Sequence, residues 1–262
     1  MPLDVYEALT FEREMVGGRN NPWLLTIKTN QGLALFVTKF FIQRDIDQQN
    51  ALSREIYTSA LAREIGLQTP EFALITIDNS FVETLPGKLK EELERKHTKF
   101  GFGSRFIPGE HTYSPAMLTR ELADYDIASI FAFDVLVLNA DRRNKKPNIL
   151  LGSDQYYLID HEHTFSLPTE DLEPRRRVSR YWFEKHIFYD VLNRKTTYGH
   201  KPEFGTFREQ FHRSNIDILD TYATELENKG YDSGDSLVIK RYLRELKQDI
   251  SYFMNIVEGA IQ

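Results

Sequence analysis

The spacing of apolar residues changes near residue 100, and this change constrains the fold more than any other feature of the chain. Before it, short apolar runs separated by turn residues predict strands, whereas after it apolar residues recur at helical spacing. Strands followed by helices are typical of an α+β arrangement with a cleft between the two parts. We therefore predict a strand-rich N-terminal lobe over residues 1–102 and a mainly helical C-terminal lobe over residues 103–262.

The composition excludes several classes of protein and site. The chain has 262 residues, of which 41% are apolar, so it can bury a sizeable core. It contains no cysteine, which excludes disulfides, thiolate metal sites and a cysteine nucleophile. A net charge of −6 argues against direct nucleic-acid binding.

The longest apolar segment, Ile127–Leu138, contains Asp134 and is too short to span a bilayer. Because Met1–Asp4 do not begin a signal peptide, we expect a cytoplasmic protein without membrane contact.

Turn residues between apolar runs predict the elements of the first part. Asn30–Gly32 separate the runs at 24–27 and 33–40, which indicates a β-hairpin. Further expected elements are a helix over 52–65 that ends at Gly66, strands over 72–77 and 81–82, and a solvated helix or loop over 88–99.

The second part is predicted to be helical with one interruption. Helical patterns cover 118–138, 204–226 and 237–261. Between the first two, apolar runs at 149–151 and 156–159 flank a polar turn, which predicts a second hairpin inside the helical region.

Polar residues surround this second hairpin. Asp141 lies in the loop before it, Asn148 at its start and Asp160 at its end. Because the two ends of a hairpin meet, we expect Asn148 and Asp160 to lie close together, with Asp141 on the adjoining loop. Such oxygen ligands suit a Mg²⁺ ion that holds substrate phosphates. Asp141 need not bind the metal and could orient a hydroxyl and take its proton.

The first part contains a candidate phosphate-binding region. Gly17 and Gly18 precede the first predicted hairpin, where a glycine pair can present backbone N–H groups to a phosphate. Lys39 shares a strand face with apolar residues by two-residue alternation. A lysine there needs an anionic partner or a route to water. Glu55 lies near the buried face of the following helix, so the sequence predicts a Lys39–Glu55 pair.

These motifs resemble those of the HipA-like kinases. That family shares with phosphoinositide lipid kinases a catalytic-loop Asp, a metal-binding Asn and a second metal-binding Asp after a hairpin. The resemblance runs from about Gly17 to Phe165. Its strongest motifs are Asn139–Arg142, Pro147–Leu151 and Leu158–His161, supported by Val37–Phe40, Gly17–Arg19 and Phe102–Phe106.

The resemblance implies a bilobal protein-kinase-like fold with ATP and Mg²⁺ as cofactors. It implies that Asp141 is the catalytic base, that Asn148 and Asp160 bind Mg²⁺, and that Lys39, oriented by Glu55, contacts the nucleotide phosphates in the N-terminal lobe. The remaining implied nucleotide-binding residues are Gly17, Gly18 and Arg19 over the phosphates, and Phe102, Ser104 and Phe106 linking the lobes near the adenine. The implied acceptor is a Ser/Thr of a protein, with autophosphorylation, a toxin-type role and an antitoxin-like partner as further implications.

The chain departs from the family pattern, and three alternatives stay open. Asn148 follows Asp141 by seven positions, a wider spacing than in the familiar kinase loop, so Asn144 is a rival metal ligand. His161-Glu162 replaces the Phe-Gly that usually follows the second metal-binding Asp. Separately, we expect the chain to represent a compact, single-module branch of the family. A catalytically silent nucleotide-binding regulator is the second alternative. A metal-dependent hydrolase is the third, in which an extended stretch would place His161 and His163 on one face.

Overall fold

A computed structural model of the chain divides into two compact units. Unit 1 comprises residues 1–56, 70–108 and 222–234, and unit 2 comprises residues 57–69, 109–221 and 235–262. Within these spans the structure describes residues 3–15, 21–96, 99–117, 119–122, 125–152, 155–165, 183–197, 199 and 201–261. The fold is a mixture of α-helices and β-strands, whereas the predicted lobe boundary at residue 102 stays a prediction.

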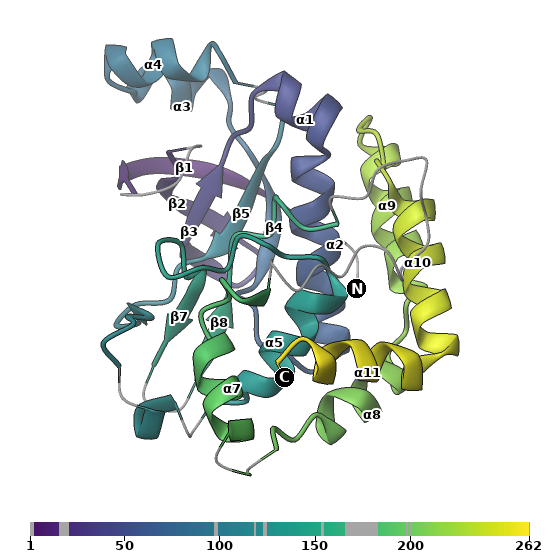
Figure 1. Cartoon of the computed structure of the whole chain (residues 1–262). Coiled ribbons are helices and arrows are strands. Elements are labelled where there is room, and N and C mark those ends of the chain that lie inside the picture. Colours follow the sequence, from purple (N-terminus) through teal and green to yellow (C-terminus); the bar gives the residue numbers. More distant parts are fainter. Residues whose placement is uncertain are drawn as a thin grey trace. The chain divides into compact units, whose positions relative to one another are not determined.

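A closed five-stranded barrel forms the centre of unit 1 (Figure 1). Its strand order is β1 (Val5–Glu14), β2 (Trp23–Thr29), β3 (Gly32–Lys39), β5 (Gly101–Arg105) and β4 (Phe72–Thr76). The pairing of β2 with β3 confirms the first predicted hairpin, and the strand expected over 72–77 is β4. Alternate residues fill the barrel, among them Trp23, Leu25, Ile27 and Phe36. Strand β1, which was not predicted from the sequence, pairs parallel with β4 and closes the barrel.

Three short helices accompany this barrel, α1 (Gln43–Gln49), α3 (Asn79–Thr84) and α4 (Gly87–Leu93). The strand predicted over residues 81–82 is wrong, because these residues belong to α3. The Asp78 carboxylate accepts a hydrogen bond of 2.7 Å from the Phe81 N–H and thereby caps the helix. This bond also holds the pKa of Asp78 below its usual value.

Helix α2 (Ala51–Glu64) corresponds to the helix predicted over 52–65. Its residues up to Ile56 belong to unit 1 and those from Tyr57 to unit 2. The chain leaves the helix at Gly66, whose φ of +83° is the left-handed conformation that glycine accepts at low cost. The Leu67 N–H bonds the Ala62 carbonyl at 2.8 Å, so Gly66 ends the helix as predicted.

Unit 2 contains the second predicted hairpin and most of the remaining helices (Figure 1). Strands β7 (Ile149–Leu151) and β8 (Tyr156–Leu158) pair antiparallel and confirm the hairpin, and β6 (His111–Thr112) adds a third strand. The helices are η1 (Thr119–Leu122), α5 (Ile127–Leu136), α7 (Tyr189–Thr197), α8 (Gly205–Arg213), α10 (Ser236–Gln248) and α11 (Ile250–Gly259). Helix α9 (Ile218–Asn228) contributes residues to both units.

Each of the three long helices predicted in the second part is divided. The pattern over 118–138 contains η1 and α5, and the Asp126 side chain caps α5 by accepting from the Ser129 N–H at 3.0 Å. The pattern over 204–226 is split between α8 and α9. The pattern over 237–261 breaks at Asp249, which caps α11. Among the described helices, none is both long and apolar enough to cross a membrane.

Candidate active site

The predicted Lys39–Glu55 pair forms within unit 1. Lys39 is the last residue of β3, and its Nζ lies 2.5 Å from Oε1 of Glu55 on α2. The Glu55 side chain is 1% exposed and that of Lys39 13% exposed. A carboxylate this deeply buried stays charged only beside a cation, so the pair explains how Glu55 can be buried.

The other described nucleotide-binding candidates lie on or beside the neighbouring strand. Phe102 in β5 is paired across the ladder with Lys39, and Ser104 with Val37. Phe106 follows the strand, and its N–H bonds the Leu35 carbonyl at 2.8 Å. The β3–β5 ladder therefore brings four predicted residues together, and their contact with a nucleotide stays a prediction. Gly17, Gly18 and Arg19 lie outside the described residues.

The predicted metal ligands flank the open end of the β7–β8 hairpin in unit 2. Ile149 pairs with Leu158, and the Ile159 N–H bonds the Asn148 carbonyl at 3.1 Å. Asn148 and Asp160 therefore lie at the two sides of this end. Both have left-handed backbones, with φ of +49° and +60°. Such angles are uncommon outside glycine and are best tolerated by Asn and Asp.

The groups at this end of the hairpin fit a divalent cation. Asn148 carries a side-chain amide oxygen at this end. A carboxylate oxygen of Asp160 lies within 4.8 Å of one from Glu162. Carboxylate and amide oxygens are the ligands that Mg²⁺ takes in proteins. The rival ligand Asn144 is exposed in the turn closed by backbone bonds between Arg143 and Lys146.

Asp141, the predicted base, is buried but lies beside two cations. Its Oδ1 lies 2.9 Å from Nη2 of Arg143, and its Oδ2 lies 3.3 Å from Nζ of Lys146. The Asp141 side chain is 10% exposed, whereas those of Arg143 and Lys146 are 47% and 41% exposed. The buried carboxylate is therefore contacted by two cations that are themselves about half exposed to solvent.

A further carboxylate of this region, Asp134 on α5, was not predicted from the sequence as a site residue. Its oxygens accept hydrogen bonds from Asn139, Arg142 and His186. Burial alone would raise its pKa, but the Arg142 charge and the His186 hydrogen bond lower the pKa of Asp134 to about 2. The available signal was a single acid inside an apolar segment, because a buried charge requires a partner.

The hydrolase alternative depended on an extended stretch at His161 and His163, and that expectation is wrong. The chain turns at Glu162 and His163, and the Thr164 N–H bonds the His161 carbonyl at 3.1 Å. The two imidazoles therefore do not alternate along a strand, and the geometric basis for a two-histidine metal site is lost.

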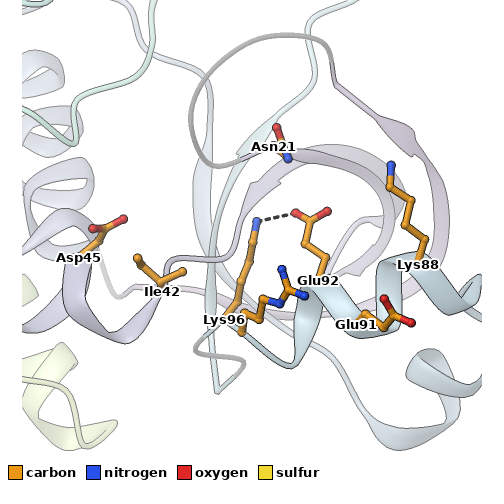
Figure 2. Close-up of a pocket in the computed structure, with 8 residues that line it drawn as sticks. Asn21, Ile42, Asp45, Lys88, Glu91, Glu92 and Lys96 are labelled. Carbon is orange, nitrogen blue, oxygen red and sulfur yellow. Dashed lines mark ion pairs between the residues drawn. The ribbon is translucent and has the colours of Figure 1, made fainter.

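A cavity of about 400 Å³ lies elsewhere in unit 1 (Figure 2). Figure 2 shows Lys96 beside Glu92, and their charged atoms are 2.9 Å apart. The lining cations and carboxylates balance one another, so the cavity has no excess charge for a polyanion such as ATP. Its lining residues are Asn21, Ile42, Asp45, Lys88, Glu91, Glu92, Arg95 and Lys96, which include none of the predicted site residues that the structure describes.

Comparisons with known proteins identify the family. No curated protein matches the chain. Among solved structures, the crystal structure of the Helicobacter pylori proinflammatory kinase CtkA aligns over 99% of both chains, with 14% identity and a TM-score of 0.49, a likeness too weak to support an inference. The model of a family described as HipA-like kinase matches residues 12–227, well over half of the chain. The chain therefore belongs to the HipA-like kinase family.

Proposed function

We propose that this kinase uses ATP and Mg²⁺ and transfers the γ-phosphate to a Ser/Thr hydroxyl of a protein. Membership of the family implies a kinase-like fold and kinase activity. The observation that carries the proposal is the open end of the β7–β8 hairpin. Asn148 and Asp160 lie at its two sides, and the loop that contains Asp141 leads into it. We further propose that the two compact units correspond to the two lobes, and that the protein acts in the cytoplasm.

In this proposal Asn148 and Asp160 would hold Mg²⁺, with the carboxylate of Glu162 close to that of Asp160. The ion would neutralise charge on the nucleotide phosphates. Lys39 contacts the phosphates and is held in place by Glu55. Gly17, Gly18 and Arg19 cover the phosphates, and the residues around Phe102 pack near the adenine, as the family resemblance implies.

Asp141 would act on the acceptor hydroxyl. Its carboxylate orients the hydroxyl and accepts its proton, while the hydroxyl oxygen bonds to the γ-phosphorus and the bond to the ADP oxygen breaks. Arg143 and Lys146, which already contact this carboxylate, restrict its orientation. Most of the acceleration then comes from positioning and charge neutralisation rather than from covalent chemistry by the protein.

The test is transfer of labelled γ-phosphate from ATP to protein in the presence of Mg²⁺. We expect transfer, to an added substrate or to the chain itself, by the wild type, and a loss of roughly 10²–10⁴-fold in Asp141→Ala. Nucleotide binding without any transfer by the wild type would instead identify a catalytically silent regulator. Comparing phosphorylated proteins in cells that express either form would identify the acceptor. Isolation of complexes from the same cells would test for an antitoxin-like partner.

A further inference from the structure

A buried cluster of polar side chains in unit 2 underlies the loop that contains Asp141. We call it the Asp134 cluster, and its members are Asp134, Asn139, Arg142 and His186. The side chains of Asp134 and Arg142 are 1% and 0% exposed. Two such charges lose their hydration on burial, and a pair of apolar residues in their place is often at least as stable. The cluster is therefore better explained by the geometry that it imposes than by added stability.

One branch of the cluster reaches the backbone of Asp141. The Asn139 side-chain amide donates to Oδ1 of Asp134 at 2.8 Å. The same amide accepts from the Asp141 N–H at 3.1 Å. Because Asn139 bonds a rigid helix on one side and the loop on the other, it fixes the start of the loop relative to α5.

A second branch reaches the backbone of Asn148. Nε of Arg142 lies 2.5 Å from Oδ2 of Asp134, and its Nη2 lies 3.3 Å from Oδ1. The remaining guanidinium nitrogen, Nη1, donates to the carbonyls of Pro147 and Asn148. The planar guanidinium thus ties α5 to the left-handed residue Asn148. A lysine cannot make all of these bonds, because it lacks the forked donors.

His186 completes the cluster from a third segment. Its Nδ1 accepts from the Phe188 N–H at 3.1 Å, so the proton lies on Nε2, which donates to Oδ2 of Asp134 at 2.8 Å. Next to it, the Ile187 N–H bonds the Arg142 carbonyl at 3.2 Å. The short segment around His186 is therefore attached to both the carboxylate and the loop.

We propose that Asp134, Arg142 and His186 are positioning residues, which hold Asp141 and Asn148 in the geometry needed for metal binding and phosphate transfer. The inference rests on the proposed function for the chemistry, and on the hydrogen bonds of the cluster for the geometry. It predicts that breaking the cluster loosens residues 139–148 and weakens metal binding, beyond the effect of a general loss of stability.

The first experiment compares Arg142→Lys with Phe253→Leu. Phe253 is fully buried on α11 against Phe207 and Phe211, so its truncation destabilises unit 2 without changing the cluster. Mn²⁺ serves as the metal probe, titrated with a non-hydrolysable ATP analogue and followed by electron paramagnetic resonance. We expect Arg142→Lys to weaken Mn²⁺ binding roughly 10–100-fold, as loss of a residue that supports a metal ligand generally does. Phe253→Leu is expected to bind Mn²⁺ like the wild type.

Hydrogen exchange of peptides spanning residues 139–148 provides a readout that needs no activity. Exchange there should accelerate in Arg142→Lys and stay unchanged in Phe253→Leu. His186→Gln retains a donor for Asp134 and should preserve most of the Mn²⁺ affinity, whereas His186→Leu should not. His186→Leu also replaces Arg142→Lys if the latter does not fold, since the surrounding rings of Phe131 and Phe188 accept an apolar side chain.

Wild-type Mn²⁺ affinity together with wild-type exchange over 139–148 in Arg142→Lys and His186→Leu would overturn the inference. Equal acceleration in Phe253→Leu would also overturn it, because the effect would then be one of stability. Failure of the proposed function has a different signature. In that case the wild type transfers no phosphate, while the exchange comparison still decides whether the cluster holds the loop.

Discussion

Two buried ion pairs, one in each unit, illustrate different ways of placing a charge inside a protein. The Lys39–Glu55 pair of unit 1 joins a strand end to a helix and leaves Lys39 13% exposed. The Asp134–Arg142 pair of unit 2 is almost fully buried and has further hydrogen bonds to each oxygen of Asp134. A pair near water can be released and remade, for example when an anionic ligand binds the lysine. A pair without access to water behaves as a fixed part of the fold.

The difference between the two pairs is tested most directly by removing Asp134. Asp134→Ala leaves the Arg142 charge buried without its carboxylate, so the free energy of unfolding should fall by about 3–5 kcal/mol. Urea denaturation measures the change. Asp126→Ala, which removes the exposed capping carboxylate of the same helix, is the matched control and should cost about 1 kcal/mol. Equal losses of unfolding free energy in the two variants would show that the buried pair contributes no more to stability than an exposed capping carboxylate.

Acid should weaken the same pair only at low pH, because the pKa of Asp134 lies below that of an ordinary carboxyl. The pKa of Asp134 is about 2 in the folded chain, below the unfolded value of about 3.9. Its charge therefore stabilises the fold above pH 4, and this contribution of roughly 2 kcal/mol is lost as the pH falls from about 4 to 2. Unfolding measured at a series of pH values should show wild type and Asp134→Asn converging over that range. If the difference in unfolding free energy between the two proteins stays constant over that range, the lowered pKa of Asp134 is contradicted.

The pair of unit 1 should be less costly to stability when it is broken, and its loss should also affect ATP binding. In Glu55→Gln, Lys39 stays near water, so the free energy of unfolding should fall by only about 1 kcal/mol. The KM for ATP should rise, because Lys39 loses the group that orients it. Thermal unfolding and steady-state kinetics measure both quantities. Glu64→Gln, an exposed acid on the same helix, should leave the KM unchanged.

The smallest effect on stability is expected at the exposed partners of Asp141. Arg143→Ala and Lys146→Ala each remove a half-exposed cation, so unfolding should change by less than about 1 kcal/mol. Phosphate transfer should fall by up to roughly tenfold, since the Asp141 carboxylate loses an orienting contact. A stability loss as large as that of Asp134→Ala would show that these exposed pairs behave like the buried one.

Local spacing explains which parts of the fold and site could be predicted. Two-residue alternation identified the strand face of Lys39, and turn residues identified both hairpins. The helix breaks near Asp126 and Asp249 could not be predicted, because the apolar spacing continues across them and single capping side chains decide the break. The strand proposed at 81–82 failed for the same reason, since a cap at Asp78 outweighs two apolar residues.

The Asp134 cluster shows which part of the site local spacing could not predict. Its histidine lies 52 residues away along the chain, in a segment with no motif that relates it to the loop. The sequence could place Asp141, Asn148 and Asp160 near one hairpin, because they are local to it. It could not predict which buried groups hold them, because those contacts depend on tertiary packing.

The strand β1 also determines whether the barrel of unit 1 has unpaired strand edges. By pairing with β2 on one side and β4 on the other, it leaves no unpaired strand edge in the barrel of unit 1. Unpaired edges are templates on which further chains add as extra strands. Loss of residues 5–14 would expose two such edges at once. With β1 in place, the barrel of unit 1 therefore offers no edge to which another chain could add a strand.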